Sequence, residues 1–337
     1  MKFKHKGLLG VCIMAFVTFL AVADRSDLYL LFSMPNTYLP PTSHLPRVVV
    51  SMTSFSDRIL FTGMMAINSI LPQPYDLFII SIPEASNNEH RGDYSSCLHE
   101  GLGDCIQEDT PDQPSTPDVI VSYLSEHLGP FQILGHPDNR KWYNVRHTIL
   151  LQFLPLDYGP ATKLLGALLI EKDPSTLIIT VDDDIEYDPG LISMLAHHAP
   201  PNAALSPVCQ MREPFEAEEA GGGKLQLRFI HDGTWHRWIW PFSSKICPGW
   251  LVGWAGVAYR VGHFGADVFT ELNSAPHGCL FNDDVWLSGY LKRRGVERAV
   301  MPWIKGGRQR RHPTKSLSAV NDTQVLTMQP CLHYYGW

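Results

Sequence analysis

The sequence has few charged residues and lacks several patterns that would indicate other classes of protein. Charged side chains make up 18% of the 337 residues, and the formal net charge of −7 argues against a general nucleic-acid binder. No CxxC pair or cysteine–histidine spacing typical of zinc occurs, so a structural zinc site is not expected. Internal repeats and coiled-coil heptads are also missing, which argues against a solenoid or a long coiled coil.

The composition favours a loop-rich α/β protein. Hydrophobic residues make up 45% of the chain, enough for a sizeable core in one large or two ordinary domains. Glycine and proline, at 26 residues each, are somewhat above average, which favours an α/β protein over a helical bundle.

The N-terminus has the pattern of a secretory-pathway signal. Residues 1–6 are basic, and residues 7–23 are uncharged and almost wholly apolar, at the short end of a membrane span of about 17–25 residues. The preceding positive charges would keep the N-terminus in the cytosol and translocate the rest. A cleaved signal peptide is the alternative, because Ala21-Val22-Ala23 fits a small-residue cleavage site. Residues 24–46, with four prolines, are expected to form a short stem.

Cysteine usage agrees with a lumenal location. Of seven cysteines, Cys12 lies in the apolar segment, and the other six could form three disulfides: Cys97, Cys105, Cys209, Cys247, Cys279 and Cys331. Cys97 and Cys105 bracket a short polar loop and are the best-supported pair. The sequence Asn321-Asp322-Thr323 is a glycosylation sequon if it is lumenal.

From residue 47 the pattern predicts strands alternating with helices. Strands are expected over 47–53, 76–82 and 177–181, and helices over 59–71, 161–171 and 191–197. Residues 119–124 fit a helix or a short strand, a strand follows at 132–134, and residues 84–117 look like a polar surface insertion. The last clear element is a helix over 283–294. This order predicts an open, mostly parallel sheet covered by helices.

Three carboxylates follow the most apolar of these strands. Asp182, Asp183 and Asp184 come directly after 177–181, where an α/β sheet opens into a ligand crevice. Carboxylates this close repel one another, so a divalent cation shared with substrate phosphates would stabilise them. The alternative is a solvated loop in which one aspartate caps the next helix.

A second acidic pair, Asp283 and Asp284, follows Asn282 about a hundred residues later. Asn282 is a good N-cap, which places both carboxylates in the first turn of a helix, where the helix dipole alone would favour them. The functional interpretation is that one of them takes the proton from an acceptor hydroxyl.

Two further segments could contribute to a site. Residues 249–256 are rich in glycine and tryptophan, which suits packing against a sugar ring, although a buried aromatic strand has the same pattern. Trp254 and Gly256 are the favoured acceptor residues. The basic segment 305–312 could close over a diphosphate, with His312 as a metal ligand, or could be a solvated loop. His277 is another candidate ligand or a turn residue.

Together, the acidic strand end, the glycine/tryptophan segment and the Asp283-Asp284-Val285 helix start resemble glycosyltransferases of the A-type (GT-A) fold. The resemblance covers about residues 47–312 and implies a single Rossmann-related α/β domain with a mixed, mostly parallel sheet, followed by a C-terminal tail, 313–337, packed on it. It implies a nucleotide-sugar donor, usually a UDP-sugar, and Mn²⁺ or Mg²⁺.

The resemblance also implies roles for individual residues. Asp184 would hold the metal, and Asp182 would lie near the donor ribose. The acidic triplet and the basic segment, taken by themselves, add Asp182 and His312 as expected metal ligands. Asp284 occupies the position of the base of inverting enzymes, with Asp283 beside it. The expected donor contacts are Thr53, Ser54, Phe55, Arg58, Lys163, Asp182 and Asp183.

The sequence therefore predicts a metal-dependent glycosyltransferase in the Golgi or endoplasmic reticulum, a type II membrane protein acting on a glycan or glycoconjugate acceptor. Two alternatives stay open. One is a non-catalytic lumenal carbohydrate-binding protein of the same fold. The other is a metal-dependent hydrolase of phosphoesters or nucleotide-sugars, although such sites usually need a denser set of His and Asp ligands.

Overall fold

The computed structural model describes residues 46–54, 58–83, 116–128, 131–133, 147–154, 157–212, 227–230, 244–301, 304, 306–309 and 321–337, all in one compact unit, 46–337. The expected signal segment, nearly all of the stem, Phe55, the Cys97–Cys105 pair and His312 lie outside the described residues. Among the described residues, no helix combines the length and apolar character needed to cross a bilayer.

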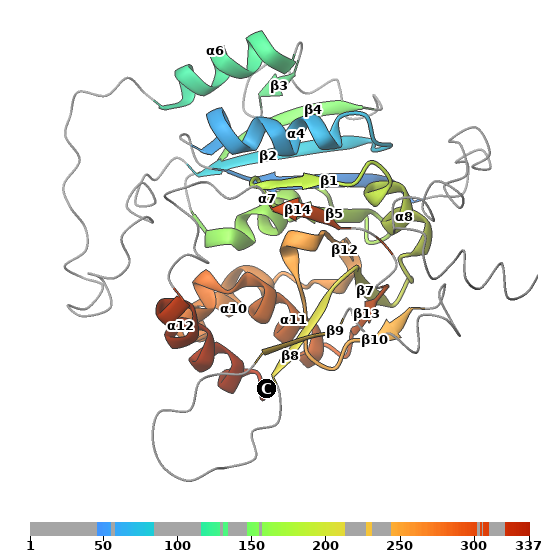
Figure 1. The fold of residues 1–337 in the computed structure, drawn as a ribbon, viewed down its shortest axis with the longest axis vertical. Coiled ribbons are helices and arrows are strands. Elements are labelled where there is room, and N and C mark those ends of the chain that lie inside the picture. The colour runs from blue at the N-terminus through green and yellow to red at the C-terminus, as the bar shows by residue number, and fades with distance from the viewer. Residues whose placement is uncertain are drawn as a thin grey trace, which may run out of the picture. The chain divides into compact units, whose positions relative to one another are not determined.

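A nine-stranded sheet forms the centre of the fold, with β2, β1 and β5 adjacent in its middle (Figure 1). Its strands, in spatial order, are β10 (Lys245–Ile246), β13 (Glu297–Val300), β7 (Ala203–Ser206), β12 (Val257–Arg260), β5 (Leu177–Val181), β1 (Val48–Thr53), β2 (Leu77–Pro83), β4 (Thr148–Leu154) and β3 (Gln132–Ile133). Two smaller sheets have the orders β11 (Trp250–Leu251), β8 (Cys209–Arg212), β9 (Leu227–Ile230), and β14 (Gly307–Gln309), β6 (Ile185–Tyr187).

The large sheet is mixed but mostly parallel, as the sequence predicts. Strands β3, β4, β2, β1 and β5 pair in parallel, and so do β13 and β7. β12 runs antiparallel to both β5 and β7, and β10 runs antiparallel to β13. Because β12 is reversed, the turn that precedes it lies at the same edge of the sheet as the carboxyl end of β5.

Helices pack on both faces of this sheet. They are α4 (Met64–Ile70), α6 (Thr116–Leu128), α7 (Thr162–Ile170), α8 (Leu191–His198), α10 (Val268–Ser274), α11 (Asp283–Arg293) and α12 (Asn321–Tyr334). A π-helical turn, η2 (Ile59–Gly63), leads into α4. Single 3₁₀ turns are η6 (Gly159–Ala161), η7 (Gly253–Ala255), η8 (Val261–His263) and η9 (His277–Phe281).

The alternation of side chains along the strands divides the core into two clusters. In β1, Val50 and Met52 join the cluster that contains α4, α6 and α8, whereas Val49 joins the cluster that contains α7, α10, α11 and α12. Strand β5 is buried at every position, as expected for a strand covered on both faces.

Most of the expected elements are present, with boundaries shifted by one or two residues. Residues 119–124 belong to helix α6, which resolves the helix-or-strand alternative. The expectation that 283–294 is the last clear element is wrong, because β13, β14 and α12 follow. Strand β4 is an apolar run that the predicted elements do not include.

Two disulfides join segments around α11. Cys279, in η9, bonds Cys331 in α12, and Cys209, in β8, bonds Cys247 just after β10. Cystine pairs of this kind are typical of oxidising compartments.

Candidate functional site

The acidic residues of both motifs meet at one edge of the sheet. Asp182 follows the last residue of β5, and turn η7 precedes β12, whose first residue, Val257, pairs with Thr180 of β5. Ser54 follows β1, the parallel neighbour of β5. This is the edge at which open α/β sheets bind ligands.

Asp183, the middle residue of the triplet, is held by the segment that follows β1. Its Oδ2 accepts a 2.6 Å hydrogen bond from the Ser54 hydroxyl, and its Oδ1 lies 2.6 Å from the Arg58 guanidinium, which is also 3.2 Å from Asp184. Burial raises the pKa of Asp183, and Arg58 and Ser54 oppose that rise. Asp183 therefore anchors the triplet to the fold.

Asp182 is more exposed than the rest of the triplet and has two contacts, one through its carboxylate and one through its backbone. Its Oδ1 is 2.5 Å from the Lys163 ammonium group, and its backbone N–H donates a 2.6 Å hydrogen bond to the Tyr187 hydroxyl. Its side chain keeps 28% exposure, against 16% for Asp184 and 5% for Asp183. Asp182 and Asp184 are thus the members of the triplet that a ligand can reach.

The second acidic pair begins helix α11, as predicted, but its N-cap works differently from the expectation. Asn282 occupies the cap position, but its side chain does not cap the helix, because its amide donates 2.7 Å to the Gly278 carbonyl in the preceding turn. Asp283 is buried, and its Oδ2 lies 3.0 Å from Lys163 outside hydrogen-bond geometry. The contact is therefore ionic.

Asp284 is oriented by the glycine of turn η7. The Gly253 N–H donates 2.8 Å to Asp284 Oδ1, and a Cβ at Gly253 would lie only 2.5 Å from that oxygen. Burial, and then the charge of Asp283, raises the pKa of Asp284 well above its ordinary value, while Lys163 and the Gly253 N–H act against the rise. A carboxyl group with a raised pKa is suited to exchanging protons near neutral pH.

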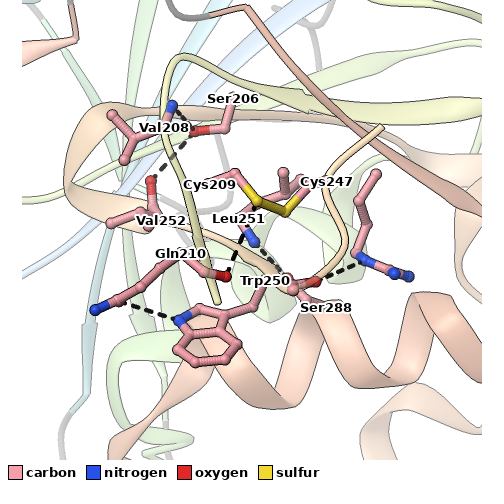
Figure 2. The surroundings of a disulfide bond; sticks show 11 residues. Ser206, Val208, Cys209, Gln210, Cys247, Trp250, Leu251, Val252 and Ser288 are labelled. Carbon is pink, nitrogen blue, oxygen red and sulfur yellow. Dashed lines mark hydrogen bonds between the residues drawn. A yellow bond between two sulfur atoms is a disulfide. The ribbon is translucent and has the colours of Figure 1, made fainter. Parts of the chain in front are cut away.

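Strand β11, which leads into η7, is hydrogen-bonded to helix α11, the helix that carries Asp284 (Figure 2). Strand β11 pairs with β8, which the Cys209–Cys247 disulfide ties down, and the Leu251 N–H donates 2.9 Å to the Ser288 hydroxyl. Ser288 lies one helical turn after Asp284. The backbone of residues 251–253 is therefore held along the first turns of α11 by two hydrogen bonds.

Several of the predicted site residues are thus brought together: Arg58, Lys163, Asp182, Asp183, Asp184, Asp283 and Asp284. Thr53 lies beside them at the end of β1, but its hydroxyl donates 3.1 Å to the Ser81 carbonyl of β2. A contact between Thr53 and the donor stays a prediction. His277 is placed at the start of η9, with its ring 5.2 Å from that of Phe281.

The two expected acceptor residues differ in their surroundings. Trp254 is partly buried in η7 and packs against Val208, Val252 and Ala255. Gly256 is buried, with φ of +85°, and a Cβ there would lie 3.0 Å from Leu191. A backbone turn and close packing thus account for Gly256, and the acceptor role of both residues stays a prediction.

Part of the basic C-terminal segment lies beside the triplet. Strand β14 pairs with β6, which begins at Ile185, the residue after Asp184, and Arg308 pairs with Glu186. A Cβ at Gly306 would approach the Ala255 carbonyl of η7 at 2.8 Å. The segment therefore packs between β6 and η7, and Arg308 is exposed.

No family model matches the sequence, and no curated protein matches it. Among solved structures, the mannosyltransferase PcManGT from Pyrobaculum calidifontis, in complex with GDP-Man and Mn²⁺, is similar at 12% identity and a TM-score of 0.43, over 96% of this chain and 78% of that one. S. aureus TarS 1–349 is similar at 10% identity and a TM-score of 0.34, over 75% of this chain and 57% of that one. The likeness is too low to argue activity, which depends on the site itself.

Three residues of the site were not expected from the sequence: Tyr187, Gly253 and Tyr259. Burial, followed by the charges of Asp284 and Asp283, raises the pKa of Tyr259 well above its usual value. Gly253 was within reach of sequence reasoning, because it lies in the glycine/tryptophan segment. Tyr187 and Tyr259 resemble ordinary strand residues, and only the packing of β6 and β12 brings them to the site.

Proposed function

We propose that the chain is a glycosyltransferase that binds a nucleotide-sugar with a divalent cation at the aspartate triplet and uses Asp284 as the base. The observation that carries the proposal is the meeting of two acidic motifs, a hundred residues apart in sequence, on either side of Lys163. One motif offers the partly exposed carboxylates of Asp182 and Asp184 to a cation and a diphosphate, and the other offers a proton acceptor.

The residues present fit a divalent cation that shares its ligands with a substrate. Five carboxylates, 182–184 and 283–284, gather at the site. In the ion pairs of the described residues, all of them except Asp284 pair with the cations Lys163 and Arg58. Among those residues, no group of three or more His, Cys, Asp or Glu side chains is placed to hold a metal by itself. Asp182 and Asp184 would supply part of the shell, and diphosphate oxygens the rest. When bound, the ion would stabilise charge on the departing diphosphate.

Asp284 would act on the acceptor. Its Oδ1 is held by the Gly253 N–H, so the carboxyl group has a fixed direction. A raised pKa makes it a stronger base than an ordinary aspartate while it is ionised. Trp254, next to Gly253, would supply an apolar face for the acceptor sugar. Removal of the hydroxyl proton by Asp284 would permit attack on the donor with inversion.

The cellular setting belongs to the same proposal. We place the enzyme on the lumenal side of the secretory pathway, anchored by its N-terminal segment. The Cys209–Cys247 and Cys279–Cys331 disulfides support an oxidising compartment.

The test measures sugar transfer from UDP- and GDP-sugars by the full chain, with and without acceptor sugars and Mn²⁺. The donor set includes GDP-mannose, which PcManGT binds. We expect metal-dependent transfer, and we expect Asp284→Asn to lower kcat about 10²–10⁴-fold with donor binding retained. Asp173→Asn is the matched control, because Asp173 is exposed and its carboxylate accepts hydrogen bonds only from Ser175 in the contacts described.

Other outcomes distinguish the alternatives. Donor hydrolysis that no acceptor diverts would indicate a hydrolase, and glycan binding without metal-dependent nucleotide binding would indicate a carbohydrate-binding protein. Full transfer activity in Asp284→Asn would remove the base assignment.

A further inference from the structure

Lys163 lies where the two acidic motifs meet, and it is only 2% exposed. Building on the proposed function, we infer that Lys163 is a positioning residue that fixes the start of α11, and with it Asp284, against the aspartate triplet, rather than a group that contacts the donor. Its Nζ lies 2.5 Å from Asp182 and 3.0 Å from Asp283.

The backbone of Lys163 is held by the sheet beneath it. The Ser51 hydroxyl of β1 donates a hydrogen bond to the Lys163 carbonyl. One turn later, Gly166 packs so closely on β2 that a Cβ would collide with the Ser81 hydroxyl. Small polar residues on the strands and a glycine on α7 therefore bring this helix close to the sheet, and the side chain starts from a fixed point.

The ammonium group lies between three segments that only the tertiary fold brings together. They are the end of β5 at Asp182, the start of α11 at Asp283, and turn η7, where a Cβ at Gly253 would lie 3.1 Å from Nζ. With both carboxylates in contact and 3% of its side chain exposed, Lys163 presents little surface to a donor. The Lys163 side chain therefore connects the end of β5 to the start of α11.

Lys163 also contributes to the electrostatic environment of Asp284. The groups that face Asp284 are Asp283 on its own helix, Asp182 from β5, Tyr259 from β12 and Lys163 from α7. Lys163 is the cation among them, and its ammonium group lies within ion-pair distance of Asp182 and Asp283.

The experiment compares Lys163→Met, Lys163→Arg, Asp283→Asn and the double variant Lys163→Met/Asp283→Asn in the full chain. Transfer is measured against pH and donor concentration, and donor affinity by calorimetry. Lys172→Met is the control, because Lys172 is exposed at the end of α7 and its ammonium group bonds only the Leu168 carbonyl in the contacts described.

For Lys163→Met we expect kcat to fall tenfold or more, roughly, because Asp284 loses its alignment. The acid limb of the pH profile should move about one pH unit or more toward alkaline pH, with donor Kd changed by no more than about threefold. Asp283→Asn should move the limb toward acid pH, and the double variant should lie between the two. Lys163→Arg should recover part of kcat, and Lys172→Met should match the wild type.

A donor Kd weakened tenfold in Lys163→Met, with kcat and the acid limb unchanged, would overturn the inference in favour of a donor ligand. If Lys163→Met does not fold, Lys163→Arg decides: a donor Kd weakened tenfold with kcat and the acid limb unchanged refutes the inference. Carbon-13 NMR of the Asp284 carboxyl group, with its signal assigned by its loss in Asp284→Asn, measures the same changes in the Asp284 pKa without requiring turnover. A protein that shows these shifts but transfers no sugar would refute only the proposed function.

Discussion

Replacing Gly253 by alanine tests whether η7 orients Asp284. A Cβ at this position would lie 2.5 Å from Asp284 Oδ1, whereas ordinary contact begins near 3.4 Å, so the carboxylate must retreat by about 0.9 Å. Displacements of about 1 Å in a catalytic group can cost about 10²-fold in rate. We therefore expect kcat to fall roughly a hundredfold.

The same change should leave the fold intact. The atoms that the new methyl group meets, Asp284 Oδ1 and Lys163 Nζ, are the ends of side chains that can move without shifting the backbone. The backbone N–H of residue 253 is also retained in alanine. Stability, measured by thermal unfolding, should change little, and donor Kd, measured by calorimetry, should stay within about threefold, since the triplet lies on another segment.

Gly262→Ala is the matched control. Gly262 lies in η8, at the opposite end of β12 from η7, and a methyl group there would lie 3.1 Å from the Pro174 carbonyl. The kcat of Gly262→Ala should equal that of the wild type. A Gly253→Ala enzyme with full turnover would refute the reasoning, because it would show that the position of the Asp284 carboxylate does not limit transfer.

Two further predictions concern the groups around the site. Tyr187→Phe leaves the Asp182 N–H without its hydroxyl partner, so the free energy of unfolding, measured with denaturant, should fall by about 1–3 kcal/mol; an unchanged value would contradict the importance of that hydrogen bond. Asp284→Asn should be more stable than the wild type at pH 7. The pKa of Asp284 in the folded protein is raised above its ordinary value of 3.8, so the wild type loses stability as pH rises from 3.8 through the folded-state pKa and Asp284 ionises. Denaturant unfolding below pH 3.8 should show the advantage gone, and an advantage that is equal at both pH values would refute the electrostatic cause.

Local patterns were sufficient to predict the position of the acidic residues. The apolar run of β5 is buried on both faces, so a strand ending at Val181 and a triplet at the sheet edge follow from the sequence. The acidic pair marked the start of α11 correctly, although the Asn282 side chain bonds Gly278 in the preceding turn instead of capping the helix. The predicted position of the N-cap is confirmed, but its predicted side-chain bond to the helix is wrong. The partner of the Asn282 amide depends on the turn that precedes the helix, which the local sequence does not determine.

The pairings across the site could not be predicted from local pattern. Arg58 meets Asp183, and Lys163 meets Asp283, across more than a hundred residues of sequence, and nothing in the spacing indicates either contact. The reversed strand β12, which brings Gly253 to Asp284, is equally a result of tertiary packing. Helix α12 was missed for a local reason: it contains Pro330, which normally argues against a helix interior.

The central claim is that Asp182 and Asp184 hold a divalent cation together with a nucleotide diphosphate. Calorimetric titration of Mn²⁺ into the full chain, with UDP or GDP present, tests this claim most directly. The account predicts nucleotide-dependent uptake of manganese by the wild type and its loss in Asp182→Ala/Asp184→Ala. Uptake that survives the double substitution, or a wild type that binds no manganese with either nucleotide, would contradict it.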